Sequence, residues 1–195
     1  MRRVIFCICV LGFCHFASAQ RAFSTGSGVI KFVSTKNSDV SAVNNNVVVN
    51  VNEEGMINFE LLVRDFRFDM AEMEEHFNKN YLESDKYPQA FFKGRIYSFK
   101  TINLTKPGLY KVKAEGDLSI HNVTKKIVVT GTLQVDKGVI VLQSKFSIDI
   151  DDYKIETGLG GMIVGSKMDV EVSARCFART PSDAGAALWR GYDFP

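Results

Sequence analysis

Apolar and polar residues alternate along most of this chain, which is the pattern of β-strands that bury one face. The alternation is clearest in residues 109–121, where apolar or small residues such as Val112 and Leu118 take every second position. Charged or polar residues, Lys111 and Asp117 among them, take the positions between. Such a strand is typical of an antiparallel sheet with one face in water. Similar patterns predict strands at residues 23–33, 47–51, 56–68, 89–100, 124–135, 139–150 and 167–177.

Short turn signals join these strands. Asn52 to Gly55, Lys106 to Gly108 and Asp136 to Gly138 each end a polar run with a glycine between two apolar segments. Seven or eight sequential strands joined in this way indicate an antiparallel meander, and closing it into a barrel removes its exposed edges. We therefore expect a mainly β fold, an antiparallel eight-stranded barrel, whose interior is filled by side chains or holds one small ligand.

Residues 69–94 interrupt the β pattern. A set of apolar residues recurs there at steps of three and four, as on one face of a helix: Met70, Met73, Phe77 and Tyr81. Asp69 stands where an N-cap is expected, with Glu72 three residues later, a variant of the capping box. Pro88 prevents the helix from continuing. The pattern predicts one inserted α-helix at about residues 69–82, which closes or crosses the barrel.

The first 19 residues have the features of a secretory signal peptide. A basic start, Arg2 and Arg3, precedes an apolar run at residues 4–16 and the small-residue cleavage site Ala17-Ser18-Ala19. The apolar run is too short to span a bilayer. We therefore expect cleavage between Ala19 and Gln20 and export of the remainder to the periplasm or the extracellular space, with no transmembrane span in the mature chain.

Three of the four cysteines, Cys7, Cys9 and Cys14, lie in this leader. Lipid attachment at Cys14 is a weaker alternative to cleavage, because the bulky Phe13 precedes it. The mature chain keeps only Cys176 and so can form no internal disulfide, even in an oxidising compartment.

The charge of the mature chain is balanced. Of the 24 basic residues two lie in the leader, which leaves 22, as many as the 22 acidic residues. A net charge near zero argues against a general nucleic-acid binder. Basic residues nevertheless dominate between Lys93 and Lys126, where they could attract an anionic head group, a membrane surface or an envelope protein. We favour the simpler interpretation of a solvated sheet face.

The mature chain has about the length of one domain and contains no linker rich in proline or serine. We expect a barrel domain at residues 20–177 and a C-terminal tail at residues 178–195. The tail is rich in small residues and then carries Trp189, Tyr192 and Phe194. Two interpretations stay open: the tail is disordered, or its aromatic residues dock on the barrel or on a partner.

Two motifs resemble a known family. His76 to Gly94 reads HFNKNYLESDKYPQAFFKG, and Gly116 to Val129 reads GDLSIHNVTKKIVV. In this order they resemble the signature of the YceI-like family of exported bacterial proteins, and the resemblance extends from about Phe23 to Phe177. It implies a lipocalin-like eight-stranded barrel with a helix. It also implies a polyisoprenoid or similar lipid as ligand, because characterised members bind such molecules in the barrel. Residues 145–156 match only loosely, and the tail has no counterpart.

In such a barrel the inward-facing apolar residues would line a lipid-binding cavity. The alternation predicts the following wall residues: Phe59, Leu61, Phe92, Ile96, Val112, Leu118, Ile120, Phe146, Val170 and Val172. Three residues of the helix would form a lid over the mouth: Met73, Phe77 and Tyr81. An error of one residue in the parity of a strand would turn its residues outward.

No motif for catalysis or metal binding stands out. His76 and His121 have no second ligand at metal spacing, and we expect His76 to pack or form a hydrogen bond near a barrel end and His121 to belong to its turn. Cys176 lies on an apolar strand face, where cysteine usually packs as a small hydrophobe. The glycines at residues 158–161 precede no helix and fit a loop better than a phosphate cradle. We therefore expect no cofactor, no metal and no enzymatic activity.

The sequence leads to the hypothesis of an exported, polyisoprenoid-binding or other lipid-binding protein. It would sequester or carry a long apolar ligand inside the barrel, where burial contributes about 0.8 kcal/mol per methylene group. The alternative is a ligand-free barrel in the cell envelope with a structural or protein-interaction role. An unrecognised enzyme ranks last.

Overall fold

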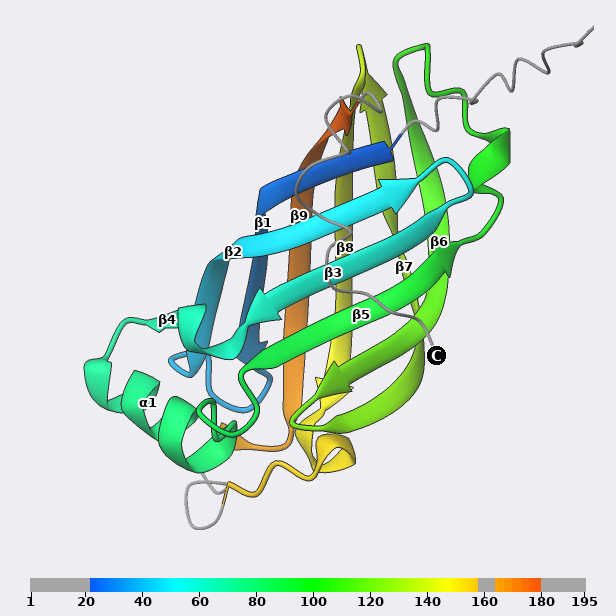
Figure 1. Cartoon of the computed structure of the whole chain (residues 1–195). Helices are drawn as coiled ribbons and strands as arrows, with labels where there is room; N and C mark the ends of the chain where they lie inside the picture. The colour runs from blue at the N-terminus through cyan, green and yellow to red at the C-terminus, as the bar shows by residue number, and fades with distance from the viewer. Residues whose placement is uncertain (1–21, 158–163, 180–195) are drawn as a thin grey trace, which may run out of the picture.

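The strands of this computed structural model form one antiparallel sheet that closes on itself (Figure 1). The structure describes residues 22–157 and 164–179. The strands are β1 (Ala22–Ser34), β2 (Ser41–Asn52), β3 (Met56–Leu62), β4 (Arg67–Phe68), β5 (Gln89–Ile96), β6 (Gly108–Ile120), β7 (Val123–Asp136), β8 (Val139–Asp149) and β9 (Lys167–Arg179). The helix α1 (Ala71–His76) widens into one π-type turn at Phe77–Tyr81, and short 3-10 turns lie at Val63–Asp65, Phe99–Thr101 and Ile150–Tyr153.

Closure comes from the pairing of β1 with β2. The strands follow one another in the order β1, β9, β8, β7, β6, β5, β3 and β2, and β2 then pairs with β1. The remaining strand, β4, has two residues and lies beside one end of β2. β1 bends between Thr25 and Ile30, where its register with β2 shifts (Figure 1). The prediction of an eight-stranded antiparallel barrel with one short helix is therefore confirmed.

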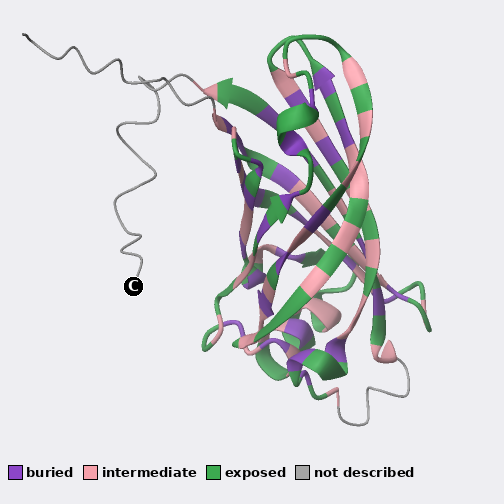
Figure 2. Ribbon diagram, turned by 90° about the vertical axis from the view of Figure 1, so that its right-hand side faces the viewer, coloured by how far each residue is buried: buried purple, intermediate pink, exposed green. Residues whose placement is uncertain are grey.

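Buried and exposed residues alternate along the strands as the sequence predicts (Figure 2). On β6, for example, Ala114 and Gly116 are buried, whereas Lys111 and Lys113 point to solvent. The most deeply buried side chains gather where β2, β7 and β9 end and β8 begins. The following residues there have almost no exposed surface: Val47, Val49, Val51, Leu133, Val135, Ile140 and Cys176. One end of the barrel is therefore filled by its own residues, and we call it the packed end.

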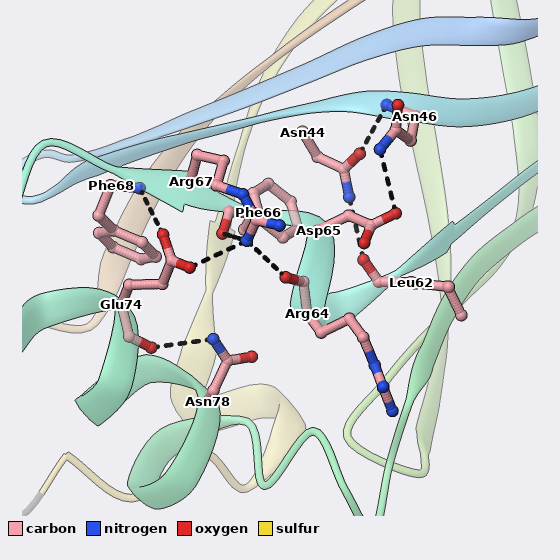
Figure 3. A network of polar contacts seen from close by, with 10 residues as sticks. All are labelled: Asn44, Asn46, Leu62, Arg64, Asp65, Phe66, Arg67, Phe68, Glu74 and Asn78. Carbon is pink, nitrogen blue, oxygen red and sulfur yellow. Dashed lines mark hydrogen bonds and ion pairs between the residues drawn. The ribbon is translucent and has the colours of Figure 1, made fainter. Parts of the chain in front are cut away.

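The strand predicted at residues 56–68 is shorter in the structure. β3 ends at Leu62, and Arg67 and Phe68 pair with β2 as β4 instead. A buried asparagine causes the break, because the Asn44 side-chain amide donates to the Leu62 carbonyl at 3.0 Å and takes the place of a backbone partner (Figure 3). The chain then turns through Val63–Asp65 before it reaches β4.

The predicted cap of the helix is wrong. The helix starts after Met70, which is the N-cap residue and makes no side-chain capping bond, so Asp69 and Glu72 form no capping box. A tertiary contact replaces it: the Glu74 carboxylate accepts a hydrogen bond from the Phe68 backbone N–H at 3.3 Å. Met70 is also 52% exposed and does not share the buried stripe predicted for it.

Two glycines face each other on the neighbouring strands β5 and β6 of the barrel wall. Gly94 pairs with Gly116, and the backbones approach so closely that a Cβ on Gly116 would lie 2.3 Å from the Lys93 carbonyl oxygen. A side chain at either position would push the two strands apart. The close approach lets the sheet curve tightly at this point.

Gly116→Ala should therefore lower the free energy of unfolding by about 2 kcal/mol, as overpacking of a tight site does. Urea denaturation followed by circular dichroism measures the change. Gly26→Ala is the matched control, because a Cβ on Gly26 meets no atom within 4 Å and should cost little. Equal stability of the two variants would contradict the close approach of β5 and β6.

Candidate ligand-binding cavity

The end of the barrel opposite the packed end is hollow. A cavity of about 570 Å³ lies there, between the strands and α1. Cavities that hold small molecules in proteins usually measure about 300–1,000 Å³. The inner side chains in this region are half-buried apolar residues that face one another across open space, among them Phe59 on β3, Leu118 on β6 and Phe146 on β8. One end of the barrel is therefore a packed core, and the other end encloses a cavity.

The structure places all the predicted site residues at this cavity. The ten wall residues line it: Phe59, Leu61, Phe92, Ile96, Val112, Leu118, Ile120, Phe146, Val170 and Val172. The three lid residues line it from the side of α1: Met73, Phe77 and Tyr81. The alternation thus predicts the inward face at the ten strand positions. Contact of these residues with a ligand stays a prediction.

Several lining residues were missed by the sequence reasoning. Ile30 and Phe32 of β1 alternate with Lys31 and were recognisable from this pattern. The pattern does not reveal Phe66 and Phe68, because it predicts one continuous strand over residues 56–68. The chain instead turns at Val63–Asp65. His76 also lines the cavity, although its side chain is largely exposed.

Four phenylalanines hold the lid on the barrel. Phe77, in the turn after α1, stacks on Phe32 of β1 at a centroid distance of 5.7 Å. Its ring also meets Phe66 at 5.6 Å and Phe68 at 5.0 Å. Aromatic pairs at such distances attract one another beyond the gain from burial alone. Phe77 is almost fully buried, so this four-phenylalanine cluster closes the cavity beneath the helix.

A polar network fixes the N-terminal part of the lid beside the cluster (Figure 3). The Arg67 guanidinium donates to the Glu74 carboxylate at 2.9 Å and to the Arg64 carbonyl at 2.8 Å. The Asn78 side chain donates to the Glu74 carbonyl at 2.9 Å. The Arg67–Glu74 pair is partly solvent-exposed and so contributes little energy, but it fixes the direction of the helix.

A second anchor ties the end of the lid segment to the β6–β7 hairpin. His121, at the turn of that hairpin with φ of 51°, lies 2.9 Å from the Glu83 carboxylate through its Nε2 atom. The Tyr87 ring packs against the imidazole edge-on at 4.5 Å. This hydrogen bond holds the pKa of the Glu83 carboxyl below its ordinary value. The two motifs noted in the sequence therefore meet in space at this contact.

The chemistry of the cavity is almost entirely apolar. No Asp, Glu, Lys or Arg of the described chain lines it, and its polar lining residues are few: His76, Tyr81, Thr130, Thr132, Gln143, Ser144 and Thr157. Within residues 22–157 and 164–179, no three His, Cys, Asp or Glu side chains are grouped so that they could hold a metal ion. Burial raises the pKa of the Cys176 thiol to about 12, so this side chain is a poor nucleophile.

The excess of basic residues between Lys93 and Lys126 is partly compensated by acidic residues on the same strands. Asp117 of β6 stands opposite Lys93 of β5 and Lys126 of β7, and Glu115 stands opposite Arg95. Such alternation fits a solvated sheet face, and contact of this face with a membrane or an envelope protein stays the alternative. The predicted signal peptide, the glycines at residues 158–161 and the part of the predicted tail beyond residue 179 lie outside the described residues. No helix in the described part of the chain is both long and apolar enough to cross a bilayer.

Comparison with known proteins gives a family match and a set of similar folds. The family model described as "YceI-like domain" matches residues 12–176. A polyisoprenoid binding domain from Saccharophagus degradans, implicated in plant cell wall breakdown, has 16% identity and a TM-score of 0.65, with 83% of this chain and 98% of that chain covered. Burkholderia cenocepacia BcnA also has 16% identity, with a TM-score of 0.63 and coverage of 76% and 95%. A Campylobacter jejuni YceI protein has 14% identity, a TM-score of 0.52 and coverage of 67% and 78%. No curated protein matches in sequence.

Phe77→Ala should loosen the lid, because it removes the ring that the other three phenylalanines share. We expect the unfolding free energy to fall by about 3 kcal/mol, the lower end for a buried phenylalanine, and amide hydrogen exchange in residues 71–81 to accelerate. Met70→Ala, at an exposed position of the same segment, is the control and should change neither. Unchanged exchange in Phe77→Ala would show that other contacts hold the lid.

Glu83→Gln should destabilise the protein at pH 7 but much less at pH 3. The folded-state pKa of Glu83 lies below the ordinary 4.5, so the ionised carboxylate stabilises the fold above that pH. The contribution is lost as the pH falls through the folded-state pKa. Urea denaturation at both pH values measures it, with the exposed Glu72→Gln as control. A difference from the unaltered protein that is equal at pH 7 and pH 3 would refute this role.

Proposed function

Because this chain belongs to the YceI-like domain family, we propose that it binds a long apolar molecule, an isoprenoid or similar lipid, inside its barrel. The observation that carries the proposal is the cavity itself. It measures about 570 Å³, is lined almost entirely by apolar side chains and lies beneath the lid. A barrel that only had to be stable would gain by filling this space with side chains, because unfilled apolar volume costs stability.

The lining decides which part of a ligand can lie inside. A charged group would lose its water there and find no oppositely charged side chain, which costs several kcal/mol. An apolar chain gains about 0.8 kcal/mol for each methylene group that leaves water. A long hydrocarbon tail is therefore the ligand that fits, and shape and burial hold it without a charged anchor. The polyisoprenoid binding domain from Saccharophagus degradans has the same fold, which supports an isoprenoid as the tail.

The same features favour binding over catalysis. The described cavity-lining residues include no carboxylate or lysine that could act as an acid or base, and the side chain of the lining histidine, His76, is largely exposed. The Cys176 thiol is buried at the packed end with its pKa raised to about 12. We propose a carrier or a sequestering protein rather than an enzyme.

Export is part of the proposal. The basic start, the apolar run and the Ala17-Ser18-Ala19 site support a signal peptide that is removed before Gln20. A mature protein in the periplasm or outside the cell would meet lipids at the membrane surface or in transit between membranes. An apolar cavity with a lid would keep such a molecule out of water during transit.

The function is tested by what the protein carries. Protein purified from an expressing bacterium should release a long-chain apolar compound on solvent extraction, detected by mass spectrometry. Ala90→Phe, which places a ring in the cavity, should fold normally and release little of it. If the unaltered protein releases no such compound and binds no added isoprenoid, the proposal fails and a ligand-free structural or interaction barrel is favoured.

A matched pair of charge variants separates the interior from the outer face. Val112→Asp points a carboxylate into the cavity and should abolish binding or folding, whereas Lys111→Asp next to it faces solvent and should do neither. Binding of a fluorescent long-chain probe and circular dichroism are the two measurements. Equal tolerance of both variants would overturn the assigned cavity wall.

A further inference from the structure

The barrel wall has a gap on one side. β7 and β8 pair from Asp136↔Val139 only as far as Gly131↔Ser144, although both strands continue beyond that rung (Figure 1). Further on, residues 123–130 of β7 pair only with β6, and residues 145–149 of β8 pair only with β9. Within the described residues, these two facing strand segments share no ladder. We call the gap between them the side window.

Contacts of β7 with β8 and with the turn after β8 bound the side window at its two ends. At its upper edge the Ser144 hydroxyl donates to the Thr130 carbonyl at 2.7 Å. Gly131 lies there so close to β8 that a Cβ would be 2.3 Å from the Gln143 carbonyl oxygen. At its lower edge the Lys125 ammonium pairs with Asp152, in the 3-10 turn after β8, at 3.0 Å. The strand segments between run for about five residues, or roughly 17 Å.

The window opens directly on the cavity. The inward residues of its two strands are all cavity-lining and half-buried: Ile127, Val129, Phe146 and Ile148. Four of the seven polar cavity residues gather at its upper edge: Thr130, Thr132, Gln143 and Ser144. Three of these four also line a shallow depression on the outer surface, together with Lys145 and Glu171. The cavity and the outer depression therefore share lining residues at this edge, which forms a polar rim that suits the polar end of a lipid.

The lid is the harder way out. To open it, the four-phenylalanine cluster must separate, and the anchors at Arg67–Glu74 and His121–Glu83 must break. To pass the window, a chain must displace half-buried side chains and break the Lys125–Asp152 pair, whose two side chains are about half exposed. Exposed ion pairs of this kind are weak. No backbone hydrogen bonds between β7 and β8 stand in the way over this stretch.

We propose that the ligand enters and leaves the barrel sideways, through the window between β7 and β8, while the lid stays in place. The inference rests on the proposed function, since it assigns a passage to the same cavity. Under this proposal the window determines how fast the ligand is exchanged, and the cavity wall determines the affinity for it.

A reversible disulfide between β7 and β8, which locks the side window, tests whether the ligand passes there. Val128 and Ser147 point outward and would face each other if the ladder continued for three more rungs. Val128→Cys with Ser147→Cys is made in the full chain with its own cysteines replaced (Cys7, Cys9 and Cys14 by Ser, Cys176 by Ala). A disulfide needs the two Cα atoms within about 7 Å, so its formation holds the window shut. If the disulfide does not form, a short bis-maleimide crosslink between the same thiols serves as the lock.

The readout is the exchange of a fluorescent long-chain isoprenoid probe, followed by stopped flow in the reduced and the locked protein. We expect the lock to slow uptake and release at least ten-fold while the equilibrium affinity changes less than three-fold, and reduction of the disulfide to restore both rates. Asp152→Ala should speed exchange, and Glu83→Gln, which weakens the His121–Glu83 anchor of the lid without altering the cavity lining, should not. Each lock is checked by circular dichroism against the reduced form of the same protein.

Two results would overturn the window, and they differ from failure of the function. If the locked protein exchanges probe as fast as the reduced one, the ligand does not pass between β7 and β8. If Glu83→Gln speeds exchange and Asp152→Ala does not, the lid is the passage. A reduced protein that binds no probe at all refutes the proposed function, and the window with it.

Discussion

Closure of eight strands into one barrel fixes how much interior space the side chains must share. At the packed end, branched residues such as Val49, Leu133 and Ile140 fill that space completely. Towards α1 the same alternation continues with apolar side chains, yet they leave about 570 Å³ between them. The hydrogen-bonded ring holds the wall in place, so the space cannot collapse as a cavity in a flexible core would. The hollow is thus stabilised by the backbone, and its apolar surface is available to a ligand.

The lid depends on the barrel rather than on its own helical propensity. α1 has six residues, too few to be stable in isolation, and no side chain caps its start. Phe77 supplies what the helix lacks, because its ring completes a cluster with phenylalanines from β1, β4 and the preceding turn. The His121–Glu83 contact then ties the following segment to the β6–β7 hairpin. This is a physical reason for two motifs far apart in sequence to occur together.

Alternation predicts which face of a strand a residue occupies, and this explains what the sequence could and could not provide. The ten proposed wall residues line the cavity because parity alone decides whether a strand residue such as Val112 or Phe146 points inward. Parity does not show where a strand leaves its neighbour. β7 keeps its alternation through Ile127 and Val129 although β8 has already separated from it. The break after Leu62 was hidden for a similar reason, since it depends on a buried Asn44 from another strand. Whether inward side chains fill or only line a barrel depends on three-dimensional distances that no local pattern contains.

A carrier of lipids must hold its ligand away from water and still release it, and these needs conflict in a fully closed barrel. Tight burial of a long chain favours slow dissociation, because most of the affinity would have to be lost before the chain could leave through the lid. An incomplete ladder changes this relation. A chain that slides out between β7 and β8 can leave a segment at a time, with the rest still buried against residues such as Phe92 and Leu118. The polar rim at Thr130 and Ser144 can solvate the end that emerges first. The barrel wall can then provide affinity while a short stretch of unpaired strand sets the rate.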